Sequence, residues 1–207
     1  MRGRRAIVQS ARRLCSSGSS GSSGSGSGGN VLTHIDRSGA ASMVDVSAKS
    51  DTQRTAVAGA SVHLGPVAFA ALTSGNNAKG NVLATARLAG IMAAKRTSEL
   101  IPLCHPVALS HVAVELLERP EAHALDITAS ATCTAPTGVE MEALTAASVA
   151  ALTVYDMCKA ASKGIVISEV RLLKKTGGKS GEWTSEAAAA AAAEEPKPAR
   201  DVRDWVL

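Results

Sequence analysis

A lysine- and glycine-rich segment near the end of the chain, Lys174–Gly181, has the composition of an anion-binding loop. The backbone N–H groups of a flexible loop, together with lysine ammonium groups, can hold a polyphosphate. The segment is not a Walker A loop, because the GxxxxGK[ST] spacing is absent and because it follows an expected strand without opening a helix. The spacing alone leaves a solvated basic loop as an alternative.

Lys79 gives a second indication of an anion site. It lies just before Asn81, a residue suited to capping the helix that follows. The ammonium group of Lys79 would then lie near a helix N-terminus, where the backbone dipole also favours negative charge. An isolated surface lysine is the alternative interpretation.

A thiol and an imidazole stand side by side in Ile101–Pro106, a loop stiffened by two prolines. Cys104 could act as a nucleophile with His105 as its base, but sequence neighbours seldom point at one another, and an inert buried cysteine is the commoner case. We therefore expect His105 to contact a substrate through hydrogen bonds.

Carboxylates recur at two places, at the start of one expected helix and near its end. Glu140 and Glu142 lie two residues apart, so they share a side if the chain is extended and diverge if it is helical, where Glu142 could simply complement the helix dipole. Asp156 and Lys159 lie three apart and share a helix face. Because the helix is otherwise apolar or small, we expect this pair to be partly buried, with pKa values suited to proton transfer; an exposed ion pair is the alternative.

The elements that would position these groups alternate between strands and helices. Asn81 and Gly164 supply a start signal and a stop signal for two of the helices. The pattern of apolar residues predicts strands over residues 43–46, 57–64, 111–117, 125–131 and 165–173, and helices over residues 66–72, from 82 to before Pro102, and 142–163. Helices packed on one face of an antiparallel sheet form an α+β fold.

Composition and charge exclude several classes of protein. The formal net charge is +4, but without Arg2, Arg4, Arg5, Arg12 and Arg13 only 17 of the 22 basic residues remain against 18 acidic ones. The positive surplus that a nucleic-acid interface needs is then missing. No run reaches the roughly 18 apolar residues of a membrane span. The 4 cysteines show no CxxC spacing, so we predict neither a metal site nor a disulfide framework.

The chain divides into three parts. Residues 1–30 are predicted to be a disordered leader, an acid-free, Arg-rich transit peptide followed by a Ser/Gly linker, with an ordinary disordered tail as the alternative. Residues 31–183 form the predicted domain, and residues 184–207 a low-complexity tail. The arginine pattern favours the mitochondrial matrix, while plastid and cytoplasm stay open.

Longer strings of residues carry a resemblance to a known family over about residues 32–181. They are LTHID at 32–36, MVDVS at 43–47, ATARLAGI at 84–91, AKRT at 94–97, LIPLCHP at 100–106, TGVEMEALT at 137–145, YDMCKA at 155–160 and the Lys174–Gly181 loop. Together they resemble the cyclic pyranopterin monophosphate synthase family of molybdenum cofactor biosynthesis. Asn81 and Ala135-Pro136 depart from the residues usual in that family.

The resemblance implies a ferredoxin-like α+β fold, with helices packed on one face of an antiparallel sheet. It implies a homohexamer, a trimer of dimers whose active site is shared across the dimer interface. The implied activity is that of a lyase converting (8S)-3′,8-cyclo-7,8-dihydroguanosine 5′-triphosphate to cyclic pyranopterin monophosphate and pyrophosphate. No cofactor is required for that reaction, and the sequence leaves open whether magnesium takes part.

The resemblance also assigns roles to individual residues of this chain. Those implied in catalysis are Asp156, Lys159 and Lys79, and those implied in substrate binding are Leu103, Cys104, His105, Glu140, Met141, Glu142 and Lys175. Two alternatives are a non-catalytic nucleotide- or phosphate-binding protein and a hydrolase that uses Cys104 and His105.

Overall fold

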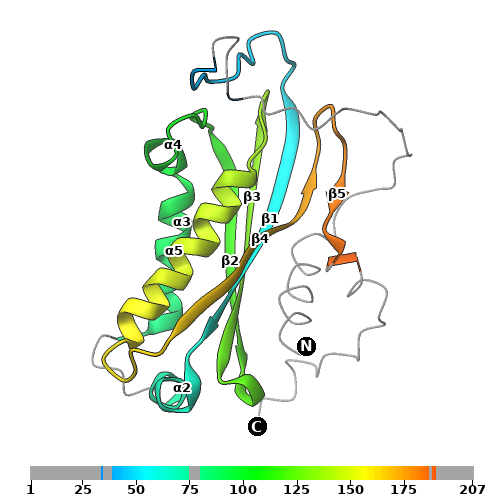
Figure 1. The fold of residues 1–207 in the computed structure, drawn as a ribbon. Coiled ribbons are helices and arrows are strands. Elements are labelled where there is room, and N and C mark those ends of the chain that lie inside the picture. The colour runs from blue at the N-terminus through cyan, green and yellow to red at the C-terminus, as the bar shows by residue number, and fades with distance from the viewer. Residues whose placement is uncertain (1–33, 35–38, 75–79, 187, 190–207) are drawn as a thin grey trace.

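A computed structural model describes residues 34, 39–74, 80–186, 188 and 189 (Figure 1). The elements follow in the order β1 (Thr52–His63), α2 (Gly65–Thr73), α3 (Val82–Ala94), α4 (Thr97–Leu100), β2 (Leu109–Arg119), a 3₁₀ turn (Pro120–Ala122), β3 (Ala124–Ala135), α5 (Glu140–Cys158), β4 (Val166–Thr176) and β5 (Trp183–Thr184). Strands and helices alternate as β-α-β-β-α-β, which is the ferredoxin-like pattern.

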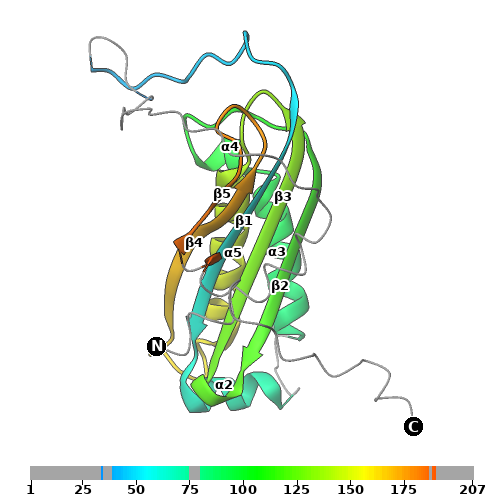
Figure 2. The same cartoon turned by 90° about the vertical axis from the view of Figure 1, so that its right-hand side faces the viewer.

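The sheet is antiparallel throughout, with the strand order β2-β3-β1-β4-β5. Helices α3 and α5 cover one face of the sheet (Figures 1 and 2). The prediction of an α+β fold with helices on one face is confirmed.

Strand β1 lies at the centre of the sheet and is longer than predicted. It starts at Thr52, five residues before the expected start at Val57, and is buried from Ala56 to Val62. The first residues of β1 are polar, so a search for runs of apolar residues misses the start of this strand. They become a strand because β3 and β4 pair with them, as Thr52 does with Ala135.

The hairpin of β2 and β3 agrees with the prediction, and its register pairs Val114 with Ala129. Two other predictions are wrong. Residues 43–46 form no strand, because that segment has no partner strand within the described structure. Lys174 and Lys175 belong to β4, so the glycine-rich loop begins only at Gly177.

Small residues bring the two long helices close to the sheet and to each other. The buried face of α3 holds Ala86, Gly90, Ala93 and Ala94, and alanines make up half of the buried residues of α5. The larger apolar residues that recur at helical spacing therefore point outward: Leu88 is 59% exposed, Met92 46% and Leu152 57%.

The helix boundaries agree only in part with the prediction. The side chain of Asn81 accepts a hydrogen bond from the Ala84 amide at 2.9 Å, which confirms the predicted cap of α3. Helix α5 ends at Cys158, not at Lys163, because Ala161 turns back to bond the Cys158 carbonyl at 2.9 Å. Within the described residues, no helix combines the length and the apolar character needed to cross a membrane.

Gly90 is the tightest point of the helix layer. A Cβ atom there would lie 2.8 Å from the Ala146 carbonyl oxygen and 3.1 Å from the Val114 side chain. Gly90→Val should therefore lower the free energy of unfolding by about 1–3 kcal/mol through overpacking. Urea unfolding measures it, with Ala84→Val at an exposed position of the same helix as control; equal stability of the two variants would contradict this packing.

Candidate active site

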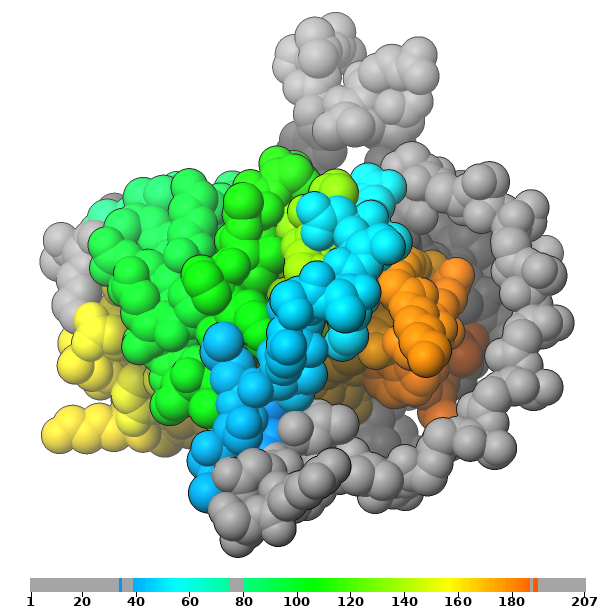
Figure 3. Space-filling view, turned by 90° about the horizontal axis from the view of Figure 1, so that it is seen from above, coloured from blue at the N-terminus to red at the C-terminus, as the bar shows by residue number. Residues whose placement is uncertain are grey.

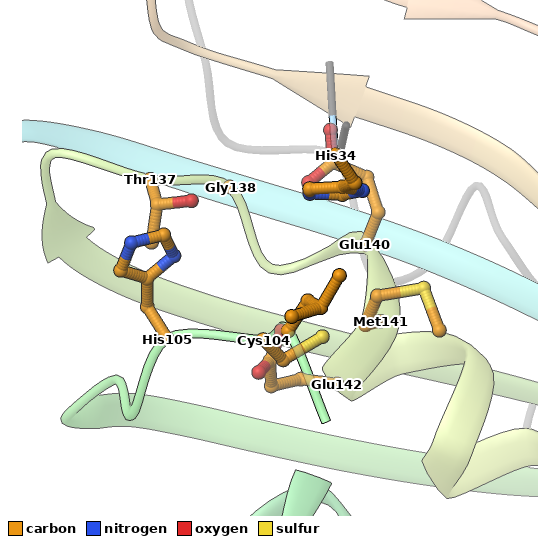
Figure 4. A pocket seen from close by; sticks show the side chains of 9 residues that line it. His34, Cys104, His105, Thr137, Gly138, Glu140, Met141 and Glu142 are labelled. Atoms are coloured by element: carbon orange, nitrogen blue, oxygen red, sulfur yellow. The ribbon is translucent and has the colours of Figure 1, made fainter. Parts of the chain in front are cut away.

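A pocket opens where the N-terminal end of α5 meets the loop between α4 and β2 (Figure 4). Its volume is about 140 Å³, which is smaller than the roughly 300–1,000 Å³ of sites that enclose a whole small ligand. It is lined by His34, Leu103, Cys104, His105, Thr137, Gly138, Glu140, Met141 and Glu142. Six residues expected to bind substrate thus meet in one place, and the size of the pocket suits only part of a nucleoside triphosphate.

The chain before β1 fixes the imidazole of His105. Seen from above, residues 39–51 run across this end of the molecule (Figure 3), and the Val44 carbonyl lies 2.8 Å from His105 Nε2. A carbonyl only accepts hydrogen bonds, so Nε2 carries the proton. In that tautomer Nδ1 is the nitrogen without a proton, and it can accept a hydrogen bond or a proton.

Glu142 is a buried carboxylate at the pocket. Only 4% of the residue is exposed, and it occupies the first turn of α5. Burial raises the pKa of Glu142, although a bond to its own backbone N–H partly opposes this effect and the negative charge of Glu140 adds to it. A carboxyl group that retains its proton more readily than usual can act as an acid in the reaction.

Cys104 is poorly suited to act as a nucleophile. Burial, and secondarily the charge of Glu142, raise the pKa of its thiol. Thiolate is the reactive form, so the environment suppresses reactivity. This disfavours the hydrolase alternative and leaves Cys104 as a residue of the pocket wall.

Lys175 connects β4 to the same pocket. Its ammonium donates a hydrogen bond to Glu140 Oε1 at 3.1 Å, and both side chains are about 30% exposed or less. Helical geometry turns the side chain of Glu140 away from that of Glu142. The side chain of Glu140 therefore faces Lys175 on β4, while that of Glu142 is buried in the pocket wall.

Asp156 and Lys159 form a second cluster at the opposite end of α5. They make an ion pair at 2.6 Å, with side chains 58% and 52% exposed, so the expected burial of this pair is wrong for the single chain. The pair lies at the end of the helix, beyond its buried alanine face. Asp156 raises the pKa of Lys159 through a hydrogen bond and through its charge.

Helix length sets the separation of the two clusters. From Glu140 to Asp156 the helix rises by about 24 Å at 1.5 Å per residue. Lys159 lines a different cavity, together with Tyr155, Ala160 and Lys163. One chain therefore does not bring all the predicted site residues together.

Six residues that line the two cavities had no assigned role in the sequence: His34, Thr137, Gly138, Tyr155, Ala160 and Lys163. His34 belongs to the string LTHID, and Thr137 and Gly138 belong to TGVEMEALT. Both strings carry the family resemblance, so the resemblance could have pointed to these residues. Lys163 lacked any signal beyond its charge. Lys79 lies outside the described residues. Nowhere in the described chain do three or more His, Cys, Asp or Glu side chains cluster closely enough to hold a metal ion.

The raised pKa of Glu142 predicts a pH-dependent effect on stability. The folded state holds this proton more tightly than the unfolded chain, so wild-type stability falls as pH rises from the ordinary glutamate value of about 4.3 through the folded pKa. Glu142→Gln has no carboxyl group to ionise, so its stability does not fall with pH in this way. The variant should melt at a higher temperature than wild type at neutral pH, and this difference in melting temperature should shrink toward pH 4. Thermal melts from pH 4 to 8 measure it, with Glu118→Gln, at an exposed position of β2, as control; a gain independent of pH would contradict it.

The chain is similar to proteins of one known family. Residues 43–178 match the MoaC family. The chain is 58% identical over 154 residues to a Rhodospirillum rubrum protein named cyclic pyranopterin monophosphate synthase, a match that covers 74% of this chain and 93% of that protein. It is 57% identical over 153 residues to an Arabidopsis thaliana protein named cyclic pyranopterin monophosphate synthase, mitochondrial, covering 74% of this chain and 57% of the relative.

A mouse protein named molybdenum cofactor biosynthesis protein 1 is 58% identical over 154 residues, which is 74% of this chain but only 24% of that relative. The chain thus spans nearly all of the bacterial relative and about a quarter of the mouse one. The extent of the family match and the identity to these relatives establish that the chain belongs to the MoaC family.

Proposed function

We propose that the chain is a cyclic pyranopterin monophosphate synthase, which converts (8S)-3′,8-cyclo-7,8-dihydroguanosine 5′-triphosphate to cyclic pyranopterin monophosphate and pyrophosphate in molybdenum cofactor biosynthesis. The observation that carries the proposal is the convergence of His105, Glu142 and the Lys175–Glu140 pair on one pocket. A basic imidazole nitrogen, a carboxyl with raised pKa and an ammonium group are what proton transfer on a phosphorylated substrate needs.

The lysines carry the phosphate chemistry in this proposal. Lys79, Lys159 and Lys175 neutralise the triphosphate and stabilise the charge that builds up on departing pyrophosphate. Glu140 holds Lys175 in the free protein, and the substrate phosphate takes over this ammonium group on binding.

Proton transfer is assigned to the remaining groups. Asp156, paired with Lys159, moves protons during opening of the purine ring and closure of the pyran ring, assisted by His105 and Glu142. Leu103, Cys104 and Met141 form the wall against the substrate. We expect no resident cofactor to be required, and leave open whether magnesium accompanies the triphosphate.

A second copy of the chain completes the site. Asp156 and Lys159 stand one helix length away from the pocket, so they reach the substrate only if another subunit presents them there. The outward-facing Leu88, Met92 and Leu152 are large apolar groups of the kind that subunit contacts cover. We propose the homohexamer, a trimer of dimers, as the assembly, since closed symmetric assemblies are the rule among homo-oligomers.

The mitochondrial matrix is the proposed location. The arginine-rich, acid-free start of the chain supports it, and so does the name of the Arabidopsis thaliana relative. Neither nucleic acid nor membrane is proposed as a partner.

Turnover of the cyclic dihydroguanosine triphosphate tests the activity. Purified protein should release pyrophosphate and form the pyranopterin product, and Asp156→Asn should lower kcat by about 10²–10⁴-fold, as loss of an acid–base group does. Glu118→Gln, an exposed carboxylate on β2, is the matched control. Pyrophosphate binding without turnover would instead favour the alternative, a non-catalytic phosphate-binding protein.

Mixed assemblies test whether the site is shared. His105→Ala and Asp156→Asn, each inactive alone, should regain about a quarter of wild-type activity when co-expressed, since random pairing leaves that share of two-chain sites intact. His105→Ala mixed with Glu142→Gln, which damages the same half, should regain none. Equal inactivity of both mixtures would contradict a shared site.

A further inference from the structure

Arg54, near the start of β1, has no role in the site described above, yet two segments of that site meet around it. Its Nε donates to the Ala135 carbonyl at 3.0 Å and its Nη2 to the Pro136 carbonyl at 3.1 Å. Both bonds are partly buried, and they link residues more than eighty positions apart in sequence. The two carbonyls end β3 and open the loop that carries Thr137 and Gly138 into the pocket.

The glycine loop that follows Lys175 packs against the same arginine. Gly178, at φ 73°, lies so close that a Cβ atom there would overlap the Arg54 guanidinium. Gly177, at φ 87°, lies against the backbone of Gln53 and Arg54 in the same way. The glycines therefore allow both the turn and the close approach to this side chain.

We propose that Arg54 is a positioning residue that holds the pocket loop and the lysine-bearing end of β4 at a fixed distance, so that Lys175 meets the substrate held by the pocket. This inference rests on the proposed function. Lys175 and Glu140 span the same gap through an ion pair, but the substrate phosphate is proposed to displace that pair. Arg54 touches neither reacting atoms nor Lys175, and it remains in place throughout the reaction.

Only arginine suits this position. The guanidinium presents Nε and Nη2 as a planar fork that reaches two carbonyls at once, while its flat face can lie against a glycine backbone. A lysine ammonium keeps the charge but is a single compact point, so it would hold one carbonyl at best and leave the other without its partner.

The experiment compares Arg54→Lys with Arg87→Lys. Arg87 is a matched control, because its Nε also donates to a backbone carbonyl at 3.0 Å, that of Val114, but it does so away from the site. Deuterium uptake of the intact protein should increase in peptides covering residues 135–139 and 176–181 of Arg54→Lys, and in neither segment of Arg87→Lys. This readout needs no turnover, so it separates failure of the inference from failure of the proposed reaction.

Kinetics supply the second readout. Arg54→Lys should lower kcat/KM about 10- to 100-fold, the scale of a small misplacement at a reacting centre. The effect of Arg54→Lys on kcat/KM should also depend on Lys175. In the double variant with Lys175→Ala, the fold-loss in kcat/KM should be much smaller than the product of the two single fold-losses, whereas the fold-losses of Arg87→Lys and Lys175→Ala should multiply. If Arg54 had only a structural role, Arg54→Lys would lower the stability of the protein without this coupling to Lys175→Ala.

The inference is overturned by wild-type deuterium uptake in both segments, or by independent effects of Arg54→Lys and Lys175→Ala on kcat/KM. Arg54→Gln, which keeps one N–H donor group, replaces Arg54→Lys if the latter fails to fold. If both variants fail to assemble like wild type, Arg54 is a folding residue and the proposal is wrong.

Discussion

The rigidity of one helix constrains the whole account. Helix α5 carries Glu140 and Glu142 in its first turn and Asp156 in its last, and an α-helix of that length places the two glutamates about 21–24 Å from Asp156 along its axis. No rearrangement of side chains closes such a gap. Under the proposed function, each chain therefore supplies two halves of a site, and the proposed chemistry requires an assembly that brings the halves of different subunits together.

The packing of helices α3 and α5 also bears on the proposed assembly. Alanine and glycine on the inner faces of α3 and α5 let these helices approach closely, and Gly90 leaves no room for a side chain. Several large apolar side chains of these helices, Leu88, Met92 and Leu152, lie outside the core. In the proposed assembly a neighbouring subunit would bury them. The residues of these two helices thus bear both on the stability of the fold and on the proposed assembly.

Much of the fold follows from the sequence, because caps, stop signals and alternation are local features. Asn81 caps α3, and the β2–β3 hairpin reads directly from its alternating residues. The start of β1 and the absence of a strand at residues 43–46 depend on distant partners, which local patterns do not encode. The apolar pattern that predicts helices α3 and α5 does not tell that Leu88 and Leu152 lie exposed on them.

The candidate site was also predicted only in part from the sequence. Leu103, Cys104, His105 and Met141 were predicted from family-like strings, and they do line one pocket. Burial of Asp156 and Lys159 was inferred from apolar neighbours in sequence, whereas exposure is decided by the position of the pair at a helix end. The raised pKa of Glu142 could not be read from sequence either, since it results from burial of a carboxylate that a surface helix would leave in water.

A crystal structure of the assembled protein with bound pyrophosphate tests the central claim most directly. The account predicts that each anion lies between Lys175 of one subunit and Lys159 of another, with His105 and Asp156 facing the same cavity. Anions held by one subunit alone, with the partner's Asp156 a helix length away, would contradict it.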